Sequence, residues 1–361
     1  MSDHEMTGFS LSPQQRAIRA LDREAGAPGC RTLAVVAVTG PCDEGRLSAA
    51  ALALAERHEI LRTRLVEAGR ARPRRWSASR ASRGRQQDDW VGCSEAEQGE
   101  RMSRLVARLS EDRGADDGLR VGLVRVGPEE RRLVLAAPAW CVDEESIAPL
   151  VRELCASTAG AGAPPEQQYA DVAEWLNGML ESEDAGDGRR FWAERRSHFG
   201  PPLHLAFSRG GAGAGAGSGR ARVDLGQGGM AQVERWSSSW QVPQRIVLLA
   251  LWASLLWRMS GGNEPEVTVA VRFDGRSLDA LAGAVGPFAR FLPVRIEISA
   301  SDTLADVARR LALAEAEAAA HQDAAPGVSH RMSWGLLRRG GRAGAVARRR
   351  AGPRARRLEH V

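Results

Sequence analysis

The 361-residue chain contains no Lys, so all 50 of its Lys and Arg residues are Arg. It also has a single Tyr, and its only Asn residues are Asn177 and Asn263. Ala, Gly and Arg stand in their place, which indicates a GC-rich coding sequence. The abundance of Arg is therefore weak evidence for nucleic-acid binding, and we do not expect nucleic acid as a partner.

The sequence also lacks the long apolar run that a membrane helix needs, about 18 residues without charge. The longest candidate, Ile246 to Trp257, is far too short to span a bilayer. The opening residues, MSDHEMTGFS, are acidic and polar, whereas a secretory signal is basic and then apolar. We therefore expect a cytoplasmic protein with no membrane partner.

Most signatures of metal, phosphate and hydrolase chemistry are missing as well. The five Cys residues are an odd number without a CxxC pair, which favours neither a disulfide framework nor a zinc site. GxxxxGK[ST], HExxH, GxSxG and a strand-to-helix GxGxxG are absent, and no two of the seven His have a metal-ligand spacing. We expect neither a metal nor an intrinsic cofactor.

The net charge of +5 comes from one end of the chain. Residues 331–361 contain ten Arg and one acid, Glu359, whereas the other 330 residues carry 40 Arg against 44 acids. Three interpretations of this basic tail stay open: a segment that binds an acidic surface, a solvated disordered end, or out-of-frame translation of GC-rich DNA. The third is favoured. A second Arg-rich segment, residues 70–85, is typical of an exposed loop.

Apolar periodicity predicts alternating helices and strands, and hence an α/β chain of two similar lobes. The Gly/Ala segment 210–219 interrupts this pattern and is interpreted as a surface excursion. Strands are expected at residues 31–39, 121–126, 133–137, 266–272 and 291–298, and helices at residues 12–21, 44–56, 146–155, 169–180, 243–259 and 303–320, the last with Asp302 as candidate N-cap.

The segment Arg131 to Asp143 (RRLVLAAPAWCVD) reads as a strand that leaves the core and turns into a helix. Active-site residues are often displayed at such a junction, so Asp143 is a candidate base and Cys141 a candidate nucleophile. The alternative is an acid at a helix N-terminus beside a buried thiol, which is favoured because no His lies nearby.

Several segments, in this order, resemble motifs of the condensation domain of nonribosomal peptide synthetases. RHEILRT is similar to that family's RHExLRT motif and is the most specific match. The matching segments, which fall within residues 7–326, are FSLSPQQRAIRAL (9–21), RHEILRT (57–63), QQYADVAEW (167–175), FWAERR (191–196), VTVAVRFDGR (267–276), VGPFARFLPVR (285–295) and HQD (321–323).

The resemblance implies two chloramphenicol-acetyltransferase-like lobes in a V, with a tunnel between them. We expect an N-terminal lobe at residues 1–175 and a C-terminal lobe at residues 176–330, followed by the tail. It also implies peptidyl or acyl carrier proteins and adjacent synthetase domains as partners, with the phosphopantetheine arms of the carriers entering the tunnel.

The chain departs from the family at its catalytic motif, HHxxxDG. Alignment on Asp143 puts Pro138 and Ala139 at the two His positions and Glu144 at the Gly position. In the family the second His positions or deprotonates the acceptor amine, and a methyl group can do neither. The motif Asp forms a structural salt bridge, for which Arg62 is the expected partner of Asp143. The resemblance also implies tunnel positions at Trp140, Arg290, Phe291 and His321.

After HQD the family continues through further strands, whereas this sequence passes into the basic tail, so we expect an incomplete second lobe with an exposed sheet edge. The favoured function is a condensation-like domain without normal amide-bond formation, in a scaffold, docking or remnant role. One alternative is an active transferase that joins carrier-bound thioesters by positioning alone. The other is a binding protein that uses its basic tail.

Overall fold

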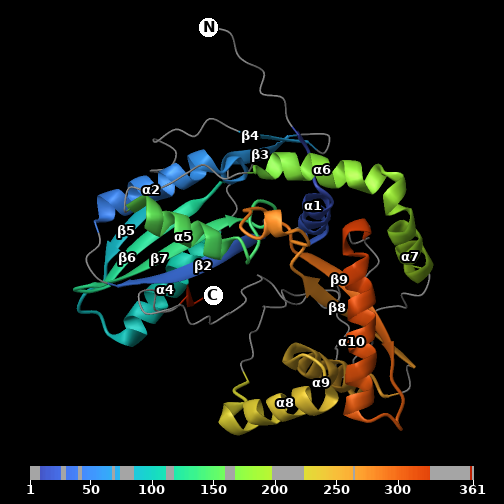
Figure 1. Ribbon diagram of the computed structural model, residues 1–361. Helices are drawn as coiled ribbons and strands as arrows, with labels where there is room; N and C mark the ends of the chain where they lie inside the picture. The colour runs from blue at the N-terminus through green and yellow to red at the C-terminus, as the bar shows by residue number, and fades with distance from the viewer. Residues whose placement is uncertain are drawn as a thin grey trace. The chain divides into compact units, whose positions relative to one another are not determined.

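A computed structural model describes residues 9–25, 30–39, 43–66, 70–73, 85–110, 118–158, 167–196, 223–262, 265–325 and 358–359 (Figure 1). The chain divides into two compact units. Unit 1 is Met1–Glu181, Arg276–Ala289 and Arg342–Val361, and unit 2 is Ser182–Gly275 and Arg290–Gly341. The mixed α/β fold agrees with the fold class expected from the sequence.

Unit 1 is built on a five-stranded sheet of order β10-β2-β7-β6-β5. Its pairs are antiparallel except β5 with β6, which run parallel. The strands are β2 (Arg31–Thr39), β5 (Arg85–Asp89), β6 (Arg120–Gly127), β7 (Glu130–Pro138) and β10 (Leu358–Glu359).

Both faces of this sheet are covered by helices, because apolar side chains occupy consecutive positions of its central strands. On β2, Ala34 and Val36 pack in one core and Leu33 and Val35 in another. Figure 1 shows α2 (Glu44–Arg57) and α5 (Ile147–Thr158) over one face and α4 (Glu95–Ser110) over the other.

A smaller sheet of order β1-β4-β3 and two further helices complete unit 1. The helix α6 packs against β1 and α1, and its buried side chains join the larger core of this unit. These elements are β1 (Phe9–Ser10), β3 (Thr63–Val66), β4 (Arg70–Pro73), α1 (Pro13–Ala25), α6 (Tyr169–Glu181) and the 3-10 turn Glu59–Arg62.

Unit 2 has a separate core around a two-stranded antiparallel sheet, β8 with β9. The helix α10 packs on β9 and on α9, and α8 packs on α9. The elements are α7 (Gly186–Arg196), α8 (Gly226–Trp240), α9 (Gln244–Met259), α10 (Leu304–Ala320), β8 (Glu266–Phe273), β9 (Arg290–Glu297) and the 3-10 turns Glu183–Ala185 and Gln322–Ala324.

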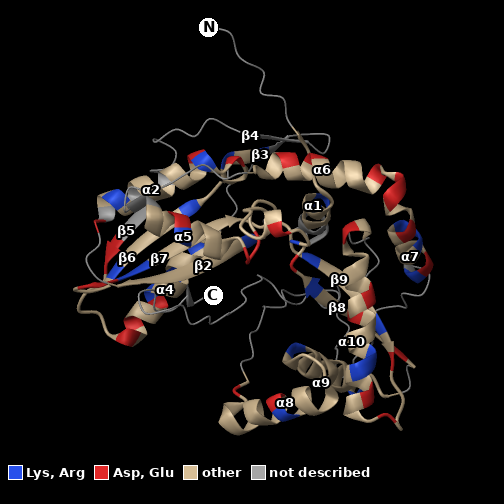
Figure 2. Ribbon diagram, in the orientation of Figure 1, with Lys and Arg blue, Asp and Glu red and all other residues tan. Residues whose placement is uncertain are grey.

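The helix α9 is apolar on two faces. Ile246, Ala250 and Ala253 are buried in the core of unit 2, as the periodicity predicts. A second stripe with the spacing i, i+3, i+4, i+7 is exposed, and consists of Leu248, Leu251, Trp252 and Leu255. Figure 2 shows how little charge this helix carries; its only charged residues are Arg245 and Arg258.

The two compact units have other bounds than the lobes expected at residues 1–175 and 176–330. The chain passes from unit 1 to unit 2 after Glu181, and Arg276–Ala289 then returns to unit 1. This return contains the 3-10 turn Asp279–Leu281, and its side chains Leu281, Val285 and Phe288 lie in the larger core of unit 1. A division read along the sequence cannot anticipate it, because it depends on burial against another unit.

Two local expectations are wrong, one for residues 70–73 and one for the N-cap of α10. Arg70–Pro73 is not a loop but the strand β4, which pairs with both β1 and β3. Of the tail, only Leu358–Glu359 is described, and it pairs with β2. The N-cap of α10 is Thr303 rather than Asp302, because Thr303 and Asp306 form a capping box. The Gly/Ala segment 210–219 lies outside the described residues.

Candidate functional site

The segment Arg131 to Asp143 contains the end of β7, at Pro138, and then turns toward α5. The turn is held at both sides: the Ala139 N–H donates to the Cys30 carbonyl (2.8 Å), and the Thr32 hydroxyl donates to the Val142 carbonyl (2.6 Å). Asp143 follows directly, with its residue 8% exposed. The junction predicted from the sequence therefore exists, and it delivers a buried carboxylate.

Six hydrogen-bond donors surround the Asp143 carboxylate. Oδ1 accepts from Arg276 Nη2 (2.9 Å), from the Ser146 N–H (3.0 Å) and from the Ser146 hydroxyl (2.6 Å). Oδ2 accepts from Arg276 Nη1 (2.9 Å) and from the N–H groups of Phe288 and Ala289 (3.0 Å each). A carboxylate offers about four lone-pair sites. The lone pairs of the Asp143 carboxylate are consequently occupied by donors from the protein itself.

The partner of Asp143 is thus Arg276 and not Arg62, which corrects the expected salt bridge. Arg62 lies in a 3-10 turn and its guanidinium contacts Glu59, three residues earlier (3.4 Å). Arg276 comes from the segment that returns to unit 1, where its guanidinium also lies 4.5 Å from the centre of the Phe288 ring. The ion pair is buried, with the Arg276 and Asp143 side chains 3% and 7% exposed.

Sequence reasoning missed Arg276 because 133 residues separate it from Asp143. The one available signal was its place at the end of the motif VTVAVRFDGR, directly after a strand.

The returning segment is held by further contacts at Gly286. The Asp143 N–H donates to the Gly286 carbonyl (3.3 Å), and the Gly286 N–H donates to the Ser146 hydroxyl (3.0 Å). A Cβ at Gly286 would come within 2.0 Å of the Tyr169 ring, so only Gly allows this approach. The Tyr169 hydroxyl lies 2.8 Å from that of Ser12 and 3.3 Å from the carbonyl that follows Gly286. Asp143 therefore belongs to a structural junction that ties this segment to α1, α5 and α6.

The RHEILRT segment also has a structural role. The His58 ring nitrogen Nε2 lies 2.8 Å from Glu153 on α5, and Arg57 Nε lies 3.3 Å from the same carboxylate. Burial acts to raise the pKa of Glu153, but the hydrogen bonds and charges of His58 and Arg57 outweigh it and bring that pKa below its ordinary value. Gln168 completes the junction by donating to the Arg57 carbonyl (2.8 Å).

Both candidate catalysts at the turn, the carboxylate of Asp143 and the thiol of Cys141, are buried. Ala139 is half-buried and carries only a methyl group, and Cys141 is 0% exposed. The alternative reading of this junction, a helix N-terminal acid beside a buried thiol, describes what is found: Asp143 accepts from the Ser146 N–H at the start of α5. Glu144, at the motif's Gly position, is half-buried.

The expected tunnel residues belong to different units. Trp140 is buried in unit 1, and its carbonyl accepts a hydrogen bond from Gln15 (3.2 Å). In unit 2, Arg290 is buried and paired with Asp323 (2.9 Å), and Phe291 is 39% exposed. His321, also in unit 2, packs against the ring of Phe191, with ring centres 4.3 Å apart.

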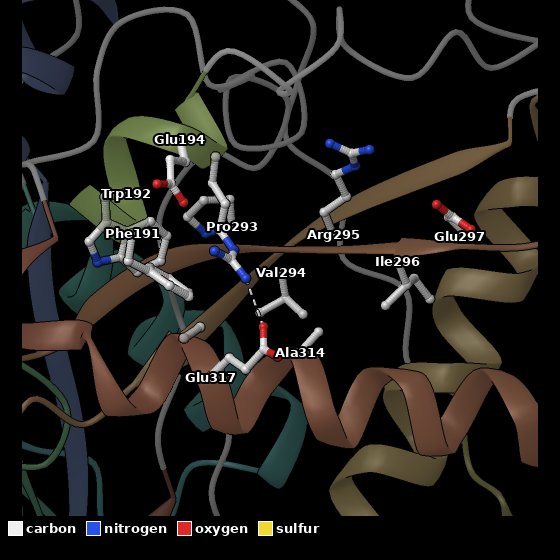
Figure 3. Close-up of a pocket in the computed structure, with 12 residues that line it drawn as sticks. Phe191, Trp192, Glu194, Pro293, Val294, Arg295, Ile296, Glu297, Ala314 and Glu317 are labelled. Atoms are coloured by element: carbon white, nitrogen blue, oxygen red, sulfur yellow. Dashed lines mark hydrogen bonds and ion pairs between the residues drawn. The ribbon is translucent and has the colours of Figure 1, made fainter. Parts of the chain in front are cut away.

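Unit 2 contains a pocket of about 380 Å³ that the sequence does not predict. Figure 3 shows its walls, which come from α7, β9 and α10. An aromatic wall, Phe191 and Trp192, adjoins an ion pair between Arg195 and Glu317 (2.8 Å). Five consecutive residues of β9, Pro293 to Glu297, line another side.

Among the described residues, no group of three or more His, Cys, Asp or Glu could hold a metal ion. In that same part of the chain, no helix is long and apolar enough to cross a membrane.

Comparison with protein families gives one match that spans most of the chain. The family described as "Condensation domain" matches residues 7–326. Among curated proteins, the "Dimodular nonribosomal peptide synthase" of Bacillus subtilis (strain 168) is 27% identical over 303 residues. That alignment covers 80% of this chain but only 12% of the synthase. The chain thus spans about an eighth of this relative's length.

Solved structures share the fold at low sequence identity. The first condensation domain of the calcium-dependent antibiotic synthetase has a TM-score of 0.71 and 20% identity, with 88% of this chain and 76% of that chain covered. The X-domain from teicoplanin biosynthesis has a TM-score of 0.72 and 24% identity, with 93% and 75% covered. The X-domain has also been solved as a complex with OxyB.

Proposed function

Since this chain belongs to the condensation domain family, we propose that it serves nonribosomal peptide biosynthesis as a docking or scaffold domain without normal amide-bond formation. Its partners in this role are carrier proteins with phosphopantetheine arms and the neighbouring domains of a synthetase. If the chain is a remnant of a larger synthetase, it would keep the surfaces that bind these partners.

One observation carries this proposal: the side chain at position 139 is a methyl group, while the carboxylate of Asp143 already accepts six hydrogen bonds. An amine that attacks a thioester must lose a proton, and general-base catalysis contributes about 10²–10⁴-fold to such steps. Neither the methyl group of Ala139 nor the enclosed carboxylate of Asp143 supplies that contribution. The X-domain, of similar fold and solved as a complex with OxyB, supports a binding role for such a domain.

We further propose that the two units are two chloramphenicol-acetyltransferase-like lobes, the second of them incomplete. Each unit has its own apolar core, which supports two lobes. The sheet of unit 2 has two strands in the described part of the chain, and a two-stranded sheet is marginal by itself. That supports an incomplete second lobe.

A condensation assay with donor and acceptor loaded on carrier proteins tests the function. We expect the unaltered chain to form the peptide bond no faster than the carriers do alone. The variant Ala139→His and the double variant Pro138→His/Ala139→His restore the imidazoles, and a rate gain of about 10²-fold or more is expected only if the rest of the site is intact.

Glu145→Gln is the matched control for this assay, because Glu145 is exposed and lies on the same turn. Robust peptide-bond formation by the unaltered chain would rule out the docking role as its main function.

A second candidate function is an active transferase in which positioning of the two thioesters supplies the rate. The intact junction around Asp143 and Arg276 favours it, because that junction holds the turn in one geometry. If Asp143→Ala leaves such an activity unchanged in a folded protein, Asp143 has no part in the reaction.

A further inference from the structure

The hydrogen bonds of β8 and β9 identify which backbone groups of β9 point away from the sheet. The Ile298 N–H donates to the Pro265 carbonyl (3.0 Å), so residue 298 is a hydrogen-bonded position of this antiparallel ladder. Such positions alternate along a strand. The even residues of β9 therefore bond to β8, and the N–H and C=O groups of its odd residues point away from β8.

Two features agree with this assignment. Pro293 has an odd residue number, so its backbone nitrogen should face away from β8. A proline has no N–H and is tolerated in a strand at such a position. The carbonyl of Glu297, also odd, accepts a bond from outside the sheet, from Arg310 Nη1 (2.7 Å). In the described part of the chain, no hydrogen bond reaches the outward carbonyl of Pro293 or the outward N–H and carbonyl of Arg295.

This open edge lies in the pocket of Figure 3, with α7 on one side and α10 on the other. The wall from α10 is shallow where Ala314 and Ala318, one helical turn apart, present only methyl groups. Val294 and Ile296 of β9 are buried in the same core as Ala318. Charged side chains of both signs also line the pocket, namely Glu194, Arg195, Arg295, Glu297 and Glu317.

We propose that the outward edge of β9 binds an extended segment of a partner polypeptide, which adds a third strand to the sheet of unit 2. Apolar side chains at alternate positions of that segment would face Ala314 and Ala318, and polar ones would face the charged residues. Pairing of β9 with the β9 of a second copy does not fit, because each β9 edge lies between the same two helices. This inference concerns the sheet of unit 2 and does not depend on the proposed function.

Binding of a strand-forming peptide tests the proposal. The probe is a fluorescein-labelled peptide with the sequence of β8, EVTVAVRF, because β8 already pairs with β9 and has Val at alternate positions. The control peptide has the same composition with its three Val in succession. By fluorescence anisotropy we expect saturable binding of the probe, at least tenfold weaker for the control. No saturable binding, or equal affinity for both peptides, overturns the proposal.

Two protein variants separate the backbone contact from the side chain. Arg295→Ala and Arg295→Pro both lose the ion pair with Glu266, but only Arg295→Pro also loses the outward N–H. We expect the probe to bind Arg295→Pro at least fivefold more weakly than Arg295→Ala, and equal affinities contradict the proposal. Circular dichroism establishes that both variants are folded.

Filling the pocket provides a second, independent variant. Ala314→Trp places a ring where the segment would lie, whereas Leu313→Trp changes a side chain of the same helix that is 69% exposed and does not line this pocket. We expect at least a tenfold loss of affinity for the first and none for the second. A tenfold gain after removal of residues 331–361 would mean that the tail of this chain, and not a partner, occupies the edge.

Discussion

At the scale of single residues, the motif Asp and the position of the motif His have separate roles. Asp143 is held by six donors from three parts of the chain, all inside unit 1. These contacts involve no group at position 139, so they do not depend on the side chain there. The junction can therefore hold whether or not position 139 carries an imidazole.

The prediction at this scale concerns Glu153. The hydrogen bonds and charges of His58 and Arg57 hold its pKa below the ordinary value of 4.5. A carboxyl with a lowered folded-state pKa stabilises the fold above its ordinary value, and this stabilisation is lost as the pH falls through the folded pKa. Glu153→Gln should therefore lower the free energy of unfolding at pH 7. The difference from the unaltered chain should shrink as the pH falls below about 4.5.

Urea unfolding at a series of pH values measures this difference. Glu100→Gln serves as the control, because its ion pair with Arg104 is on the surface, with both side chains about 70% exposed. A difference for Glu153→Gln that does not vary with pH would contradict the prediction.

At the scale of elements, the sequence predicts β2, β6 and β7 of the five-stranded sheet, but not its outer strands β5 and β10. Residues 31–39 form β2 within the predicted bounds, and 133–137 lie inside β7, because β-branched and apolar residues fill these strands continuously. The helices α9 and α10 differ from their predicted ranges by a single residue at the N-terminus. Strong local periodicity is sufficient for elements of this kind.

Other elements could not be predicted, since their stability depends on distant contacts. The strand β4 contains Arg and Pro, and it forms because β1 and β3 pair with it on either side. The helix α8 begins with three Gly in four residues, a composition that argues against a helix. In the candidate site, Pro138, Ala139 and Asp143 could be named from sequence. Four of the six donors to Asp143 could not, because they come from the returning segment, from Arg276, Phe288 and Ala289.

The prediction at the scale of elements concerns the segment that returns to unit 1, Arg276–Ala289. Gly286→Ala would place a methyl group against the Tyr169 ring, and overpacking of this kind costs about 1–3 kcal/mol of folding free energy. Gly283→Ala, in the same segment, has open space around the new methyl group and should cost far less. Equal destabilisation of the two variants in urea unfolding would show that the contact with Tyr169 is unimportant.

A double-mutant cycle sharpens this test. In a Tyr169→Ala background the ring is gone, so Gly286→Ala should cost less than it does in the unaltered chain. Additive effects of the two substitutions would contradict direct contact between these residues.

At the scale of the whole molecule, the basic character of the chain resides in its last 31 residues. Without residues 331–361 the sequence has 40 Arg and 44 acidic residues, whereas the complete chain has a net charge of +5. We predict that the shortened chain binds an anion exchanger at pH 7 and passes through a cation exchanger. The complete chain should do the reverse. Identical elution of the two forms would contradict this charge distribution.

The single tyrosine of the chain is Tyr169, which is 2% exposed and whose ring packs edge-on against Phe288. Any reagent specific for phenols therefore reports on one place in the molecule. Nitration by tetranitromethane would be slow while Arg276–Ala289 is seated and would accelerate when that segment detaches. The absorbance of nitrotyrosine would therefore measure how often this segment detaches, without an attached label.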